Sequence, residues 1–133
     1  MITKKVLTLA DLKGMAEACE AHAKANGWNV SFAIVDDGAH LLYLVRMDGA
    51  SPATAQTCIR KARSAALYRR ETKTQEENIK AGRVSMLNMP DIMPLEGGVP
   101  IVIDNQVIGA VGVSGVQSAQ DAEIARAGIA TLG

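Results

Sequence analysis

Two histidines are the side chains best suited to metal ligation or proton transfer near neutral pH. His22 lies in a run with helical periodicity, beside Met15 on the margin of an apolar stripe. A neutral imidazole in that position could ligate iron or act as a base, or it could be a half-buried surface histidine. His40 opens a predicted strand after a turn and is expected to be structural.

Basic side chains and a pair of glycines offer anion-binding chemistry elsewhere in the sequence. Lys61 lies near the predicted buried face of a helix, where an ammonium group can hold a carboxylate, act as a base, or extend to solvent. Gly97 and Gly98 could direct backbone N–H groups at an anion, as in an oxyanion hole, or form a turn into a strand. Arg46 and Asp48 are candidates for binding an acid group and for a general base.

Standard catalytic motifs are missing from the sequence. It has no glycine-rich dinucleotide loop, P-loop, zinc-protease motif or serine-hydrolase motif. Glu17 and Glu20, at i, i+3 spacing on a predicted helix, could share a hard metal ion. They point away from the apolar stripe, so we expect a solvated face there instead.

The composition argues against several functional classes. The chain has 133 residues, with 14 basic and 14 acidic side chains, and this zero net charge gives no support to nucleic-acid or membrane-surface binding. No apolar run reaches the roughly 18 residues of a membrane span, and the N-terminal segment lacks a signal-peptide core. Cys19 and Cys58 are not spaced as a redox or zinc motif, so we expect reduced, buried thiols and a cytoplasmic protein.

Helical periodicity and capping signals predict three main helices. Residues 8–26 form the first, with Thr8 and Asp11 as an approximate capping box. Residues 51–70 form the second, and a final helix is expected to be capped by Ser118-x-x-Asp121. The predicted buried stripe of the second helix comprises Ala55, Ile59, Ala62 and Ala66.

Alternating apolar residues and turn signals predict two hairpins. Strands 28–35 and 40–47 flank an Asp-Gly turn, and the return strand, apolar on both faces, is expected to be central. Strands 99–103 and 106–113 form the second hairpin. Glycines in or beside the last strand indicate close approach of a helix, another chain or a ligand: Gly109, Gly112 and Gly115.

The order of elements predicts a single α+β domain over residues 1–133. Because strands come in hairpins and not singly between helices, the sheet should be largely antiparallel. The irregular segment 71–96 contains methionines that suit an adaptable pocket wall or a cover over the core: Met86, Met89 and Met93.

Five segments occur in the same order as in one known family: Val35–Leu41, Arg46–Ala50, Lys61–Ala66, Gly97–Ile101 and Val107–Gly115. On these segments the whole chain resembles the GlcG/HbpS-like family, which includes the C-terminal domain of PduO-type proteins and is often labelled haem-degrading. It departs from the usual pattern at Ala39, where Asp-x-Gly-Gly-His has its second glycine, and at Ser64, where threonine is usual.

The resemblance implies a profilin-like α+β fold, with an antiparallel sheet flanked by helices, and a homo-oligomer. Some members bind haem, and others accompany operons for glycolate, propanediol or glycerol use. A histidine on the first helix is an axial-ligand candidate in some haem-binding members, and His22 occupies such a helix.

The leading hypothesis is a small-ligand-binding accessory protein with haem as its cofactor, acting in haem storage, sensing or degradation. His22 would be the metal ligand, and Arg46 and Lys61 would neutralise the propionates. The Gly97-Gly98 turn and the methionine-rich segment would wall the pocket.

Two alternatives of different classes remain open. The first is a cytosolic enzyme acting on a small carboxylate or aldehyde. In it, Gly97 and Gly98 would stabilise an oxyanion, Lys61 or Arg46 would bind the acid group, and Asp48 would be the base. The second is an oligomeric interaction module without a ligand, in which glycines pack one chain against another: Gly109 and Gly112.

Overall fold

Four antiparallel strands form one sheet in the order β2-β1-β4-β3 in the computed structural model, which describes residues 1–133. The strands are β1 (Ser31–Asp36), β2 (Leu41–Arg46), β3 (Gly98–Ile103) and β4 (Gln106–Ser114). The helices are α1 (Leu9–Ala25), α2 (Pro52–Tyr68), α3 (Thr72–Lys80), the short 3-10 helix η1 (Val84–Asn88) and α4 (Ser118–Ile129). The predicted α+β class and antiparallel sheet are confirmed.

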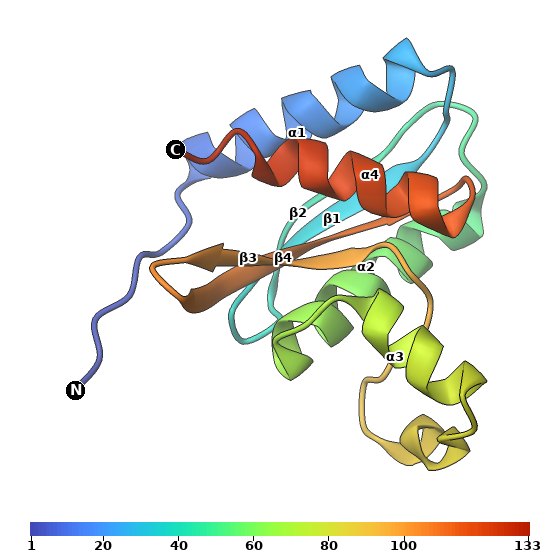
Figure 1. The fold of residues 1–133 in the computed structure, drawn as a ribbon. Helices are drawn as coiled ribbons and strands as arrows, with labels where there is room; N and C mark the ends of the chain where they lie inside the picture. Colours follow the sequence, from blue (N-terminus) through green and yellow to red (C-terminus); the bar gives the residue numbers. More distant parts are fainter.

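The helices lie in layers on the two faces of the sheet. Figure 1 shows α1 and α4 side by side on one face and α2 on the other. The segment from α3 to η1 extends past the end of α2, away from the sheet. None of these helices is both long and apolar enough to span a bilayer.

Local capping signals fix the start of α1 but mislead at α4. The Thr8 hydroxyl accepts from the Asp11 N–H at 3.2 Å, and the Asp11 carboxylate accepts from the Thr8 N–H at 2.8 Å, so the predicted capping box is confirmed. The predicted cap at Ser118 is wrong, because Gln117 is the N-cap of α4. Asp121 turns inward and is 2% exposed.

The return strand of the first hairpin, β2, is an edge strand, so the prediction that it is central is wrong. β1 and β4 occupy the centre because each pairs with two neighbours, whereas β2 pairs with β1 alone. Apolar residues on both faces of β2 indicated burial, but its leucines stay exposed at 47%, 38% and 40%: Leu41, Leu42 and Leu44.

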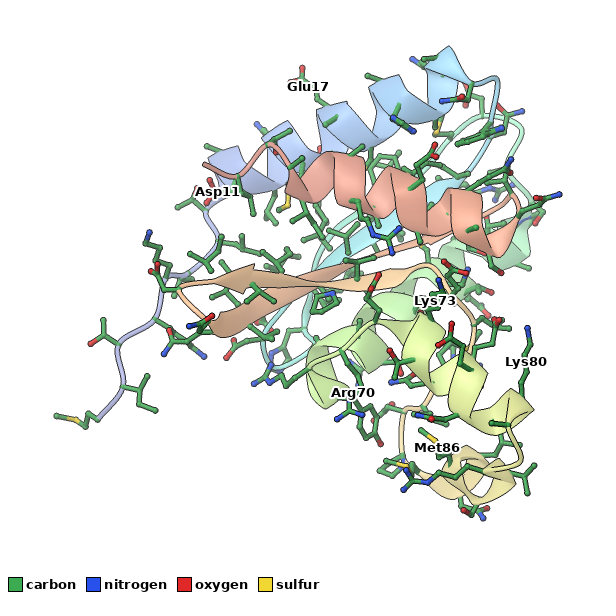
Figure 2. The ribbon with its side chains drawn as sticks, in the orientation of Figure 1. Asp11, Glu17, Arg70, Lys73, Lys80 and Met86 are labelled. Atoms are coloured by element: carbon green, nitrogen blue, oxygen red, sulfur yellow. The ribbon has the colours of Figure 1, made fainter.

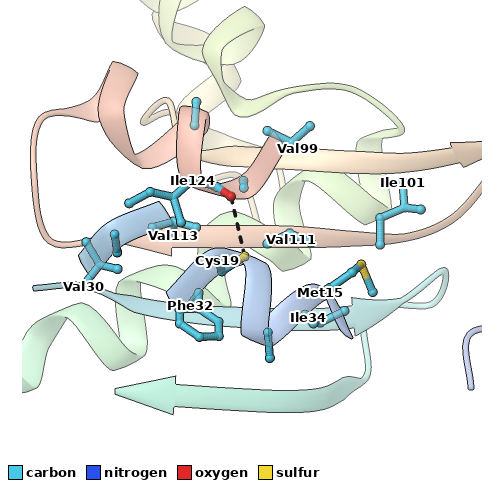
Figure 3. Packing of buried hydrophobic residues seen from close by; sticks show 14 of the residues in the cluster. Met15, Cys19, Val30, Phe32, Ile34, Val99, Ile101, Val111, Val113 and Ile124 are labelled. Atoms are coloured by element: carbon cyan, nitrogen blue, oxygen red, sulfur yellow. Dashed lines mark hydrogen bonds between the residues drawn. The ribbon is translucent and has the colours of Figure 1, made fainter. Parts of the chain in front are cut away.

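The two faces of the sheet carry separate apolar clusters. The larger, of 17 residues, lies under α1 and α4 and contains Met15, Phe32 and Ile34. Figure 3 shows these side chains, with the Cys19 thiol of α1 donating to the Ile124 carbonyl of α4. The smaller cluster has eight residues, lies under α2 and consists mainly of alanines.

Glycine allows α2 to approach the sheet closely. A Cβ on Gly112 would lie 2.1 Å from the Cys58 carbonyl oxygen and 2.5 Å from the Ala62 nitrogen. Gly109 is crowded by other parts of the chain, because its Cβ would lie 2.5 Å from the Val35 carbonyl oxygen of β1 and 3.0 Å from the Leu7 side chain. These glycines therefore serve packing within one chain, which corrects the idea that they pack one chain against another.

The buried stripe of α2 is partly as predicted. Ala62 and Ala66 are buried, but Ala55 and Ile59 are only half-buried. The helix is rotated so that other side chains reach the sheet as well: Cys58, Lys61 and Ala65. Lys61 thus lies inside the molecule, which has consequences for its chemistry.

Candidate ligand-binding site

One end of the sheet gathers most of the residues that the sequence marked for chemistry. Ser31, at the start of β1, faces Arg46 at the end of β2 and Ser114 at the end of β4. Gly98 starts β3 at the same end, and His22 lies in the last turn of α1. Hairpins and antiparallel pairing bring these chain segments together although they are far apart in the sequence.

His22 lies where α1 packs beside α4. Its Nε2 is 2.7 Å from a carboxylate oxygen of Glu123 on α4, and its side chain is 32% exposed. The imidazole ring lies 6.1 Å from the indole of Trp28, centroid to centroid, at an interplanar angle of 53°. The structure therefore presents a half-exposed imidazole oriented by a carboxylate, next to a flat aromatic ring.

Arg46 and Asp48 lie on the exposed side of this end. The Arg46 Nε donates to the Ala50 carbonyl at 3.0 Å, and no protein acceptor is in hydrogen-bond range of its other guanidinium nitrogens. Asp48 follows in the exposed turn before α2 and makes no hydrogen bond. The backbone links this turn to the segment after α1, because the Met47 N–H donates to the Val30 carbonyl at 3.0 Å.

Lys61 lies inside the protein in a buried ion pair. Its Nζ donates to the Asp121 carboxylate at 3.1 Å and to the Val113 carbonyl at 2.9 Å, and the two charged side chains are 3% and 2% exposed. Burial raises the pKa of Asp121 above its ordinary value, and the Lys61 ammonium opposes that rise. The ammonium therefore has its acceptors within the chain.

Gly97 and Gly98 make room for Lys61. A Cβ on Gly97 would lie 2.8 Å from the Lys61 Nζ, and one on Gly98 would lie 2.3 Å from its carbonyl oxygen. The N–H of Gly98 donates to the Thr72 hydroxyl at 2.9 Å. In this conformation Gly98 is satisfied by the protein and does not offer its amide to an oxyanion.

Nothing in the sequence assigned a functional role to two residues of this region, Asp121 and Thr72. Asp121 looks in sequence like part of a helix cap, and only its pairing with Lys61, 60 residues away, reveals its role. Thr72 opens α3 and is fully buried. A spacing rule could not find either contact, because the first depends on how α2 and α4 lie on the sheet and the second on where α3 meets β3.

A groove between α1 and β2 lies near these residues. It has a volume of about 460 Å³, and its apolar floor includes Phe32, Tyr43 and Val45. Lys13, Glu17 and Glu20 of α1 form its rim. His22 is outside it, on the flank of α1 that faces α4. The groove exists because β2 is an edge strand that α1 covers only in part.

The comparisons with known proteins agree on one family. A family model described as "Haem degrading protein HbpS-like" matches residues 7–130. Protein GlcG of Escherichia coli K12 is 48% identical over 114 residues, which cover 86% of this chain and 85% of that protein.

Solved structures share the fold over nearly the whole chain. A double mutant of Streptomyces reticuli HbpS superposes with a TM-score of 0.90 at 30% identity, covering 100% of this chain and 91% of that one. The PduOC:haem complex gives a TM-score of 0.89 at 23% identity, covering 97% of this chain and 96% of the other, a likeness of fold alone.

Proposed function

This chain belongs to the family of HbpS-like haem-degrading proteins, and on that premise we propose that it binds haem as its small ligand. The observation that carries the proposal is the half-exposed imidazole of His22 beside Trp28. When bound, haem supplies an iron centre for ligand binding and redox chemistry. Such binding would serve the storage, sensing or degradation of haem.

The surroundings of His22 fit an iron ligand. Histidines that bind metals commonly donate their other ring N–H to a carboxylate, which fixes the tautomer and the ring orientation. Glu123 is placed for that function, at 2.7 Å from Nε2. No cluster of three or more metal-binding side chains is present, so the iron would need the porphyrin as its main ligand set.

Arg46 would hold a propionate of the haem at the same end of the sheet. Its guanidinium is exposed and lacks a carboxylate partner, and such a group binds carboxylates through paired N–H donors. We leave Lys61, Gly97 and Gly98 out of the ligand contacts, because Lys61 already holds Asp121 and the glycines accommodate it.

Titration with hemin, followed by absorption spectroscopy, tests the proposal. We expect a saturable Soret band in the wild type, a lost or shifted band in His22→Ala, and roughly tenfold weaker binding in Arg46→Met. His40→Ala is the matched control, because His40 is 78% exposed at the opposite end of β1.

An unchanged Soret band in His22→Ala would contradict the ligation by His22. If Tyr43→Phe removed the band instead, the haem would lie in the groove between α1 and β2. If the wild type gave no saturable band, the haem proposal itself would fail.

We also propose that the protein is a cytoplasmic homo-oligomer. Unpaired edge strands with exposed apolar residues readily pair with another chain, and β2 exposes Leu41, Leu42 and Leu44. A second copy of β2 would complete the pairing and cover these leucines. Both cysteines are free, in keeping with a reducing compartment.

Light scattering after size-exclusion chromatography tests the assembly. Leu44→Lys should reduce the molecular mass of the assembly. Leu87→Lys is the control, because Leu87 is exposed on η1, away from the sheet. An unchanged mass for Leu44→Lys would exclude this edge as the interface.

A further inference from the structure

A second cavity lies outside the sheet, where the end of α2 meets α3 and η1. Its volume is about 220 Å³. Figure 2 labels Arg70 and Met86, two of the residues around it. The cavity shares no residue with the His22 end of the sheet. It is lined by Tyr68, Arg70, Gln75, Arg83, Met86, Met89 and Ile92.

Gln75 brings an unpartnered donor to this cavity. Its side chain is 1% exposed, and its Nε2 has no hydrogen-bond partner. Its Oε1 is 2.7 Å from the Ser64 hydroxyl, which in turn accepts from the Met93 N–H at 3.1 Å. The Ser64 hydrogen is therefore directed at Oε1. Gln75 lines the cavity, and its amide nitrogen is the polar atom of that side chain left without a partner.

An unsatisfied buried donor is costly and calls for an acceptor. A buried N–H without a partner loses the full free energy of its hydration. Native proteins satisfy nearly all such groups, with protein, water or ligand. The Gln75 amide nitrogen has two N–H donors, so a carbonyl or carboxylate oxygen is the group that it lacks.

Two guanidinium groups add positive charge without a counter-charge. Arg70 and Arg83 line the cavity, make no ion pair and lie with no acidic residue in the lining. Two nearby arginines, in contrast, have partners within the protein. Arg63 pairs with Asp91 at 3.6 Å, and Arg69 donates to the Asp37 carbonyl at 2.7 Å. The charge of the lining therefore favours a negative ligand.

The rest of the cavity lining is largely apolar. Met86 and Ile92 are buried, and Met89 is half-buried. These side chains can contact a hydrocarbon chain, and methionine adapts its shape to what it touches. A ligand that fits must therefore combine an anionic head with a short apolar body.

We propose that this cavity binds a small organic carboxylate. One carboxylate oxygen accepts from the Gln75 amide, and the guanidinium groups of Arg70 and Arg83 neutralise the charge. The methionine wall contacts the carbon chain. This site goes beyond the proposed haem function and would operate beside it.

Titration with sodium butyrate, followed by NMR, tests the site directly. We expect saturable binding that shifts the side-chain amide resonance of Gln75, and at least about tenfold weaker binding of butyramide, which has no charge. Equal binding of butyramide would overturn the proposal. So would tighter binding of inorganic phosphate than of butyrate, or a Gln75 amide resonance that butyrate does not move.

Variants separate this site from a general attraction to positive charge. Arg70→Met and Arg83→Met should each weaken butyrate binding about tenfold without unfolding the chain, because both side chains are exposed. Arg60→Met is the matched control, since Arg60 is exposed on α2 outside the cavity and should bind butyrate as the wild type does. An equal loss in Arg60→Met would overturn the proposal.

The two proposals fail independently. Arg70→Met and Arg83→Met should leave the hemin titration unchanged, and His22→Ala should leave butyrate binding unchanged. Butyrate binding that is lost in His22→Ala and kept in Arg70→Met would overturn the assignment to this cavity.

Discussion

The two faces of the sheet are built to different thicknesses. Under α1 and α4 the core contains large side chains, with Phe32, Met15 and Ile34 among those that are almost fully buried. Under α2 it consists of alanines together with Val35 and Cys58. The α2 backbone therefore lies so close to β4 that Gly112 has no space for a Cβ.

This difference in packing determines how each face tolerates amino-acid substitutions. A thick layer of interlocking side chains can be reshaped if its volume is kept. A thin layer has backbone against backbone and cannot move aside for an added atom. The Lys61–Asp121 ion pair joins the two faces, because Lys61 lies on α2 and Asp121 on α4.

The largest effect is expected where the two faces are joined. Lys61→Met leaves the buried Asp121 carboxylate without its cation, and we expect a loss of about 3–5 kcal/mol in the free energy of unfolding at neutral pH. Urea denaturation followed by circular dichroism measures it. A loss below about 1 kcal/mol would mean that the ion pair does not join the faces energetically.

The same variant should depend on pH in a defined direction. Burial raises the pKa of folded Asp121, and removing Lys61 removes a group that lowers it. Between the unfolded and folded pKa values the folded state then holds more protons, so stability falls as pH rises through that window. The double variant Lys61→Met/Asp121→Asn has no such carboxyl. The difference in the free energy of unfolding between Lys61→Met and this double variant should therefore be larger near about pH 8 than near about pH 5.

A single added carbon should be costly on the thin face. Gly112→Ala places its Cβ against the backbone of Cys58 and Ala62, so we expect destabilisation of about 1–3 kcal/mol or more. Thermal denaturation measures the change. Gly14→Ala in α1 is the control, because nothing lies within 4 Å of a Cβ there. Equal stability of Gly112→Ala and the wild type would show that α2 moves away at little cost.

A change of shape on the thick face should cost less. Met15→Leu keeps the volume of a fully buried side chain, and we expect a loss below about 1.5 kcal/mol. The same denaturation experiment gives the value. If Met15→Leu destabilised the protein more than Gly112→Ala, the contrast between thick and thin faces would be wrong.

One cysteine on each face reports local opening, which is the smallest effect expected. Burial raises the pKa of both Cys19 and Cys58 to about 12, so neither thiol should react with a thiol reagent while the protein is folded. Gly112→Ala should increase the labelling rate of Cys58 more than that of Cys19, as mass spectrometry of the labelled peptides would show. Equal acceleration would indicate that the faces open together.

Local signals made most of the fold predictable from the sequence. The capping box of Thr8 and Asp11, the Asp-Gly turn and the alternation in the hairpins each depend on residues close together in the chain. Close approach of a helix at Gly112 was also among the predictions. The element order follows from such signals.

Non-local contacts explain what the sequence could not show. An apolar run such as β2 looks the same whether the strand is central or at an edge, because strand order depends on distant pairing. The candidate residues were placed at one end of the sheet by that pairing, and Lys61 was drawn inward by Asp121. The methionines of segment 71–96 predicted a pocket wall or a cover over the core, and Met86 and Met89 line the Gln75 cavity. The unpartnered Gln75 amide could not be predicted, because a missing partner is visible only when every neighbour is known.

The pairing of β1 with β4 also sets when the molecule can fold during synthesis. β1 starts at Ser31, yet its second partner and the helix that holds Asp121 come from the last third of the chain. Until that part has been made, Lys61 has no counter-ion and one edge of β1 is unpaired. Until then the nascent chain exposes one unpaired edge of β1, and an exposed strand edge of this kind is a surface that chaperones bind.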